Sequence, residues 1–270
     1  MSSVGAPLVK VEGRRLSALE GAGTLIHRNY LVYRRDWVVF VTGFLEPVFY
    51  LLSIGIGVGT LIPGFEVNGQ HVPYADYVAP GMLAASAMNG AIFDATFNVF
   101  FRLKYAKLYD QILATPRTVG DVARGEIGWA LIRGGIYSTA FLAVMAGFGM
   151  VHSWWGLLTV PATLLIGYAF ASVAMSLTTW IRSWQDFEYI TLALMPLFLF
   201  SATFFPITRY PQWLQWVVEA TPLYRGVVLC RELATGAIGW GSLVSVLYLV
   251  AMGALGTVLV RRRLSRLLLT

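Results

Sequence analysis

Residues 156–181 read GLLTVPATLLIGYAFASVAMSLTTWI, a stretch of 26 residues without one charged side chain. A helix needs about 20 apolar residues to cross the hydrocarbon core of a bilayer, because it rises about 1.5 Å per residue. Helices at the surface of soluble proteins keep a polar face instead. The stretch therefore predicts a membrane-spanning helix, and it decides the fold class of the chain.

Five further apolar blocks accompany this one. The six blocks cover residues 37–62, 77–101, 125–150, 156–181, 190–205 and 238–260. Together they predict an all-α membrane protein with six transmembrane helices. We expect one membrane domain at 37–260, preceded by an N-terminal segment at 1–36 and followed by a basic tail at 261–270.

The Lys and Arg residues lie almost entirely in alternate gaps between these blocks. Sixteen of the 20 precede the first block, follow the second, follow the fourth or follow the last. Because loops rich in Lys and Arg stay in the cytoplasm, both termini are predicted to be cytoplasmic. The net charge of +6 belongs to these flanks, where anionic lipid headgroups account for it. Membrane lipids are expected partners, and nucleic acid is not.

Three segments outside the blocks have patterns of their own. Residues 14–36 can form an amphipathic helix at the inner headgroup layer, although a plain anchor is the alternative. In the longest inside loop, 104–113 predicts a short helix before the turn at Thr115-Pro116-Arg117, and Thr118 with Asp121 resembles a capping box. Such a projecting helix suits docking to a cytoplasmic partner, the alternative being a solvated connector.

The outside gap before the last block is unusual. Pro206 ends the fifth block early, and 211–220 then predicts an aromatic helix that is too short to cross the bilayer. We expect a re-entrant or interfacial hairpin, because irregular backbone at membrane depth must be buried in protein or line a cavity. The alternative is a simple aromatic anchor.

Ionisable residues inside apolar blocks are costly and face the bundle interior, a partner or a water-filled path. Glu46, Asp94 and Arg133 are such residues, and Arg133 shares a helix face with Glu126. Pairing of Glu46 or Asp94 with Arg133 would be purely structural. A direct role in a path predicts the same burial, so both interpretations stand.

Catalytic and nucleotide-binding patterns are missing. The three His residues form no metal-ligand spacing, and none of the three Lys residues follows a glycine, as a phosphate-binding loop requires. The single cysteine, Cys230, excludes an internal disulfide. We expect no enzyme activity and no cofactor on this chain. If ATP is used, another chain must bind it.

Several segments resemble the permease subunits of ABC type-2 exporters, in the NodJ-like (nodulation-factor) branch and its drug-resistance relatives. The matching segments are YVAPGML at 77–83, LATPR at 113–117, GEI at 125–127, MPLFLFSATFFP at 195–206, PQWL at 211–214 and TPLYRG at 221–226. The resemblance covers nearly the whole chain. Arg225 departs from it, because many relatives have histidine there.

The resemblance implies an exporter half in a bacterial cytoplasmic (inner) membrane, crossed several times. A second permease chain, identical or related, would complete the path, and two copies of an ATPase subunit would supply ATP and Mg. Lipid-linked, glycolipid or drug-like cargo is implied. Docking to the ATPase would fall to Lys104, Lys107, Asp110, Thr115, Pro116, Arg117 and Asp186. The path or intramembrane charges would be Glu46, Asp94, Asn98, Glu126 and Arg133, and the outer gate Phe204, Phe205, Trp213, Trp216 and Tyr224.

Two other classes compete with an exporter subunit. An ion- or proton-coupled carrier would use Glu46, Asp94 and Arg133, but paired repeats or helices interrupted in both halves are expected of it. An intramembrane lipid-modifying enzyme would need a clustered nucleophile, base or metal set. The sequence offers neither pattern.

Overall fold

In the computed structural model, residues 18–34, 45, 48–49, 51–62, 64–67 and 70–268 are described. Glu46 and most of residues 37–50 in the first apolar block lie outside these ranges. The α-helices are α1 (Ala18–Tyr33), α3 (Tyr74–Phe93), α4 (Val99–Lys104), α5 (Leu108–Leu113), α6 (Val119–Gly147), α7 (Thr159–Thr178), α8 (Phe187–Leu199), α9 (Gln212–Glu219), α10 (Pro222–Thr235) and α11 (Trp240–Leu268). Short elements complete the list: η1 (Leu51–Gly57), η2 (Val58–Thr60), η3 (Asp94–Asn98), η4 (Trp154–Leu158), η5 (Trp184–Asp186), η6 (Ile207–Arg209), β1 (Phe65–Val67) and β2 (Gln70–Val72).

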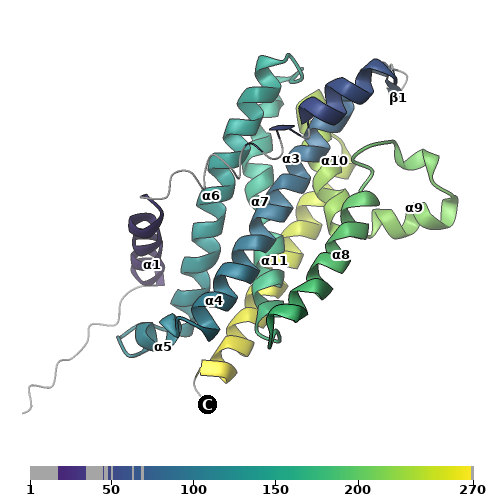
Figure 1. Ribbon diagram of the computed structural model, residues 1–270. Helices are drawn as coiled ribbons and strands as arrows, with labels where there is room; N and C mark the ends of the chain where they lie inside the picture. The colour runs from purple at the N-terminus through teal and green to yellow at the C-terminus, as the bar shows by residue number, and fades with distance from the viewer. Residues whose placement is uncertain are drawn as a thin grey trace, which may run out of the picture.

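The long helices form a bundle around α7, with α3, α6, α10 and α11 against it (Figure 1). Small residues allow the closest approach. A Cβ added at Gly256 of α11 would lie 2.8 Å from the backbone nitrogen of Val173 on α7, so only glycine permits this contact. The buried side chains Ile166, Phe170 and Met175 of α7 belong to the main hydrophobic core.

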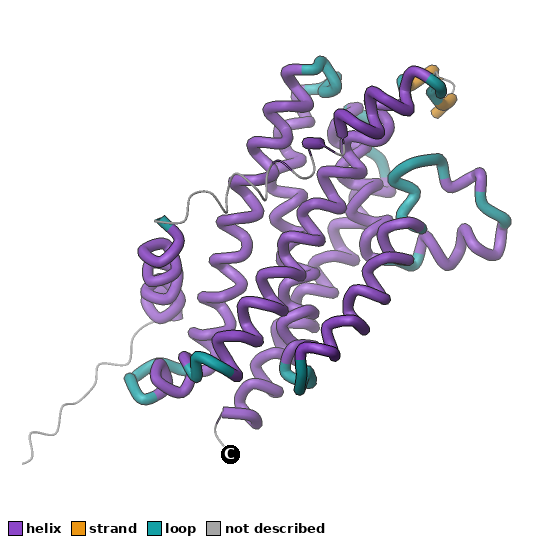
Figure 2. Tube along the Cα trace, in the orientation of Figure 1, coloured by secondary structure: helices purple, strands orange, loops and turns teal. Residues whose placement is uncertain are grey.

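Three of the described helices are long and apolar enough to span a membrane, namely α6, α11 and the segment Trp154–Thr178 that contains α7. The second predicted block is also helical throughout, since α3, η3 and α4 follow one another without a break over 74–104. The described part is predominantly helical (Figure 2). An all-α membrane protein is therefore confirmed, although β1 and β2 form a small antiparallel hairpin that the sequence did not predict.

One predicted boundary is wrong. The helix of the fifth block ends at Leu199 instead of continuing to residue 205, because the backbone turns at Ala202, whose φ of +54° is left-handed. Most of the predicted basic tail at 261–270 continues the last helix, since α11 extends to Leu268. Arginine has a high helix propensity and keeps its charged end in the headgroup layer, so a spanning helix can extend past its apolar part.

The N-terminal helix α1 packs on α6 (Figure 1). A Cβ on Gly125 would lie 2.6 Å from Cβ of Leu25, and one on Gly128 would lie 2.9 Å from Cδ1 of Ile26. The apolar face that the sequence analysis assigned to the headgroup layer is thus in contact with protein. Glycine on α6 makes the contact possible because it leaves room for the side chains of α1.

Candidate functional site

Asp94 and Arg133 form a buried ion pair between η3 and α6. Oδ1 of Asp94 lies 2.8 Å from Nη2 of Arg133, and each side chain is less than a tenth exposed. The side-chain amide of Asn98 donates a second hydrogen bond, of 2.8 Å, to the same oxygen. The Arg133 guanidinium also lies over the ring of Tyr33, 5.5 Å from its centre. One of the two predicted pairings of Arg133 is therefore present.

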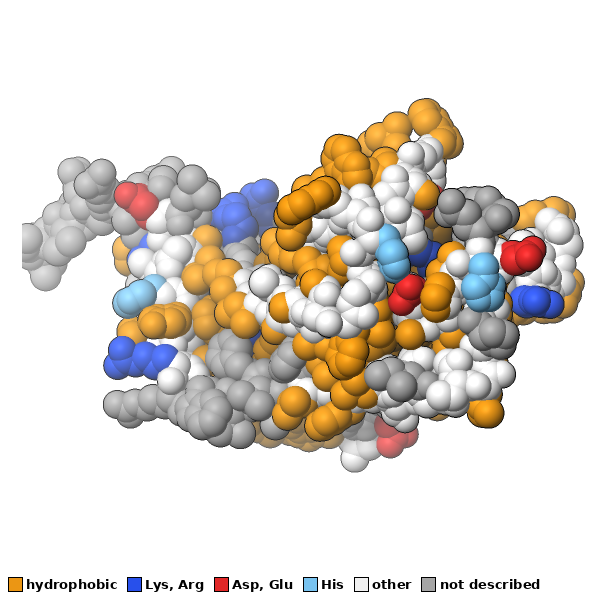
Figure 3. All heavy atoms as spheres, turned by 90° about the horizontal axis from the view of Figure 1, so that it is seen from above, with side chains coloured by type: hydrophobic (Ala, Val, Ile, Leu, Met, Phe, Trp, Pro, Cys, Tyr) orange, Lys and Arg blue, Asp and Glu red, His pale blue; other side chains and the backbone are white. Residues whose placement is uncertain are grey.

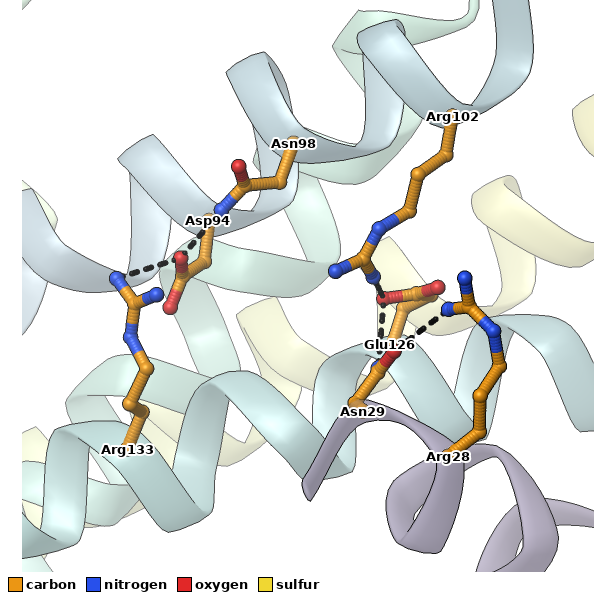
Figure 4. A network of polar contacts seen from close by, with 7 residues as sticks. All are labelled: Arg28, Asn29, Asp94, Asn98, Arg102, Glu126 and Arg133. Atoms are coloured by element: carbon orange, nitrogen blue, oxygen red, sulfur yellow. Dashed lines mark hydrogen bonds and ion pairs between the residues drawn. The ribbon is translucent and has the colours of Figure 1, made fainter. Parts of the chain in front are cut away.

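A second ion pair lies about two helical turns away on the same face of α6. Arg102 of α4 pairs with Glu126, whose carboxylate also accepts a 3.3 Å hydrogen bond from the Asn29 side chain of α1. Arg28 donates in turn to the Asn29 oxygen at 2.9 Å. Figure 4 shows the two groups side by side, with α1 reaching the second one. The network therefore ties three helices together.

The sequence analysis did not name Arg28, Asn29 or Arg102 as members of this network. A signal for Asn29 was present, because it lies four residues from both Leu25 and Tyr33 on one face of α1. An amide on an apolar helix face points to a polar partner on the neighbouring helix. Arg102 directly follows the second apolar block, where a basic residue is expected at the membrane surface without any partner.

The loop predicted to dock a partner contains the short helix α5, which begins at Leu108 rather than at residue 104. Lys104 ends α4, and Lys107 adopts a left-handed φ of +44° that redirects the chain. Asp110, Thr115 and Pro116 are exposed, as are both lysines, whereas Arg117 is half-buried. The predicted capping box is confirmed: Thr118 Oγ1 accepts from the Asp121 N–H, and Asp121 accepts from the Thr118 N–H.

Tyr109 anchors α5 to the bundle. Its side chain is fully buried, and the charges of Glu126 and Arg102 act on its hydroxyl. Burial, and next the Glu126 carboxylate, raise the pKa of Tyr109 well above its ordinary value, so the phenol is neutral at physiological pH. Through Tyr109, α5 is therefore in direct contact with the second ion pair, while its other face is exposed.

The short turn after α7 lies at the same end of the molecule. Asp186 accepts hydrogen bonds from the backbone N–H groups of Arg182, at 2.7 Å, and Ser183, at 3.1 Å. These bonds hold the pKa of the Asp186 carboxyl below its ordinary value. The half-buried Asp186 thus belongs to the capping box that begins η5 at Ser183, which gives this predicted docking residue a structural role.

An aromatic cluster joins this turn to the end of α4. We call Phe97, Phe100, Tyr105, Trp184 and Phe187 the inner aromatic cluster. Phe97 stacks on Phe187 with ring centres 4.2 Å apart, and Trp184 lies 5.6 Å from Phe100 and 6.3 Å from Tyr105. The sequence analysis missed these contacts, since nothing in one helix indicates which ring of another it will meet.

The opposite end carries the predicted hairpin. α9 is observed over Gln212–Glu219, within the predicted 211–220. Trp213 and Trp216 are about two-thirds exposed, Phe205 is 37% exposed, and Tyr224 is half-buried on α10. Phe204 packs on Phe198 with ring centres 5.3 Å apart. Seen from above, the described residues present many hydrophobic side chains and few charged ones (Figure 3).

Arg231 of α10 holds the start of this hairpin. It donates to the carbonyl oxygens of Ala202, at 3.0 Å, and Tyr77, at 3.3 Å, and lies 3.8 Å from the centre of the Tyr77 ring. These contacts secure the left-handed turn at Ala202. This role of Arg231 was not predicted, because no sequence pattern links it to a carbonyl 29 residues earlier.

Within the described residues, no group of three or more His, Cys, Asp or Glu side chains could hold a metal ion. The features that stand out are the exposed short helix α5, two buried ion pairs behind it and an exposed aromatic hairpin at the far end. They belong to a helical membrane protein.

Comparison with known proteins identifies the class. The pattern of the ABC-2 type transporter family matches residues 21–235, and the chain belongs to this family. It is similar to Nodulation protein J of Rhizobium meliloti, with 32% identity over 88% of this chain and 91% of the relative. Nodulation protein J of Rhizobium leguminosarum bv. trifolii is 31% identical over 95% of this chain and 100% of the relative.

A more distant relative is the daunorubicin resistance ABC transporter permease protein DrrB1 of Streptomyces coeruleorubidus. It is 21% identical over 84% of this chain and 79% of the relative. The resemblance stated from sequence is thus confirmed, and the chain is a multi-pass membrane component of a transporter. Membership implies an ABC ATPase as partner.

Proposed function

We propose that this chain is the permease subunit of an ATP-driven exporter in a bacterial cytoplasmic membrane. The chain crosses the membrane six times, and both of its termini lie in the cytoplasm. A second permease chain completes the path, and two copies of a separate ATPase subunit bind ATP and Mg. The cargo is a lipid-linked, glycolipid or drug-like molecule taken from the cytoplasm or the inner leaflet.

The observation that carries the proposal is the position of Tyr109. It lies within the exposed helix α5 and is itself fully buried beside the Arg102–Glu126 pair. A partner that pushes on α5 therefore acts on α4 and α6 at once. Through Asn29 the same displacement reaches α1. This is the mechanical connection that a permease needs if its motor is another chain.

The exposed docking face favours a protein partner with both acidic and basic side chains. Lys104, Lys107 and Asp110 project from it without an ion pair to any described residue. The half-buried Asp186 belongs to the second turn at this end. The inner aromatic cluster holds the two turns together, so both can meet one surface.

At the far end, the hairpin with α9 is suited to an outer gate. Trp213 and Trp216 are exposed on α9, and aromatic rings of this kind prefer the membrane interface. The turn at Ala202 is fixed by Arg231, so the hairpin is attached to α10. Closure of the ATPases would change access from the inside to the outside.

The test is co-expression of the chain with an ATPase subunit encoded beside it. We expect a stable complex with two copies of each subunit by mass, and ATPase activity in lipid that the permease modifies. A chain that transports alone, ignores ATP and follows the proton gradient would refute the proposal. Co-expression with an unrelated ABC ATPase is the control for nonspecific capture.

A further inference from the structure

A groove separates α7 from α8, although only a short turn connects the two helices. Its volume is about 570 Å³. The lining is almost entirely apolar and includes Ala174 and Leu177 of α7 and Ala193 and Leu197 of α8. The floor is completed by Ile92 of α3 and Met252 of α11. An apolar space of this kind within a membrane must be filled by something other than water.

The length of the groove matches that of an acyl chain in one leaflet. From Asp186 to Leu197, both of which line it, α8 rises about 16 Å at 1.5 Å per residue. This is close to half of the roughly 30 Å hydrocarbon core, which is the depth of one leaflet. An acyl chain is thin enough to enter.

The end of the groove near α5 carries a cation. Trp180 lines the groove there, and the guanidinium of Arg263 lies 4.1 Å from the centre of its ring. No ion pair joins Arg263 to a carboxylate in the part of the chain that the structure describes. The carboxylate of Asp186, also at this end, accepts the two backbone N–H groups of its own turn. The groove is therefore apolar along its length and has at one end a guanidinium that forms no ion pair with a described residue.

We propose that this groove binds one acyl chain of an anionic phospholipid, with the lipid phosphate on Arg263. Given the proposed orientation, the lipid comes from the inner leaflet and its chain fills that leaflet's depth along α8. The lipid is a resident component and is distinct from the cargo. It keeps α8 at a fixed distance from α7, where protein contacts between these two helices are sparse.

The test compares binding of phosphatidylglycerol and phosphatidylcholine to the purified protein by native mass spectrometry. We expect one phosphatidylglycerol per chain to be retained. Arg263→Gln should lower its apparent affinity about fivefold, the effect of one cation near an anionic headgroup, whereas the exposed neighbour change Arg262→Gln should leave it unchanged. Phosphatidylcholine should bind more weakly and should not respond to either substitution.

A second pair of variants tests the channel. Ala193→Trp fills the groove and should abolish retention, while Leu192→Trp, whose parent side chain is 71% exposed and does not line the groove, should not. A phosphatidylglycerol with a photoreactive group on its acyl chain should label α7 or α8 peptides. These readouts do not require the ATPase, so they can fail while the proposed exporter function stands.

Three results would overturn the inference. Equal lipid retention by all four variants would show that the groove is not the site. Efficient crosslinking between two protomers through a cysteine at position 193 would show that a second copy of the chain fills it. Release of the labelled lipid during each round of ATP hydrolysis would show that the groove carries cargo.

Discussion

The carboxylate of Asp94 and the guanidinium of Arg133 face each other at 2.8 Å inside the bundle, and neither has more than a tenth of its side chain exposed. Removing one partner leaves an uncompensated buried charge, which costs about 3–5 kcal/mol. We therefore expect Arg133→Gln to lower the thermal unfolding midpoint in detergent strongly. The double change Asp94→Asn with Arg133→Gln should recover most of the loss, since no charge remains. Arg262→Gln, at an exposed position, is the control. A double variant no better than the single one would show that the pair does more than balance charge.

The contact between α1 and α6 depends on glycine. Gly125→Ala would place a methyl group 2.6 Å from Cβ of Leu25, and such overpacking costs about 1–3 kcal/mol. We expect α1 to separate, with faster tryptic cleavage at Arg28. Gly134→Ala on the same helix has no neighbour within 4 Å and should be neutral or slightly stabilising. Equal cleavage of both variants would show that α1 is held mainly by Asn29.

The inner aromatic cluster should matter for coupling between ATP hydrolysis and transport. Trp184→Ala removes ring contacts to Phe97, Phe100 and Phe187, each worth about 1 kcal/mol. We expect severalfold less transport per ATP hydrolysed, with unchanged co-purification of the ATPase. Trp154→Ala, at a position 90% exposed near the opposite end, is the control. Unchanged coupling would mean that the two turns act independently.

Charge at the docking face should control assembly. Asp110 is exposed on α5, so Asp110→Arg is not expected to alter folding. Because it reverses a charge on the proposed contact surface, we expect at least a severalfold loss of co-purified ATPase. Glu66→Arg, at an exposed position on β1, should have no effect. Normal assembly of the Asp110 variant would place the docking surface elsewhere.

The contacts by which Arg231 holds the outer hairpin can be tested with one conservative substitution. Arg231→Lys keeps the charge but loses the planar group that bonds to two carbonyls and lies on the Tyr77 ring. We expect a thiol reagent added from outside to label a cysteine at position 203 faster, since Thr203 is fully buried. Arg209→Lys, at an exposed position in the same loop, is the matched control. Identical labelling would mean that the Ala202 turn holds without Arg231.

Features that depend on neighbours in sequence could be predicted. The Thr118–Asp121 capping box and the short helix α9 both follow from local residue types, and both are present. Fold class followed from the length of uncharged stretches. The break between α4 and α5 was predicted a few residues too early, because Tyr105 and Lys107 have no preference that marks a turn.

Features that depend on contacts between helices could not be predicted from one sequence. Arg231 meets a carbonyl 29 residues away and Asn29 meets Glu126 across 97 residues, and no periodicity within a helix specifies these partners. Arg133 was expected to pair with either Asp94 or Glu46. The structure selects Asp94, and Glu46 lies outside the described residues.

The π-helical segment η3 determines how the chain from Asp94 to Arg102 presents both charged residues to α6. On α6, Glu126 and Arg133 are seven residues apart and so lie within about 20° of each other around the axis. Their partners Arg102 and Asp94 are eight apart, which in a continuous α-helix would turn them about 80° away from each other. The wider turn at 94–98 absorbs one residue and restores the angular match. Conversion of this turn to ordinary α-helix without loss of a residue would rotate the two partners apart and break one ion pair, while every side chain of both pairs stays in place in the sequence.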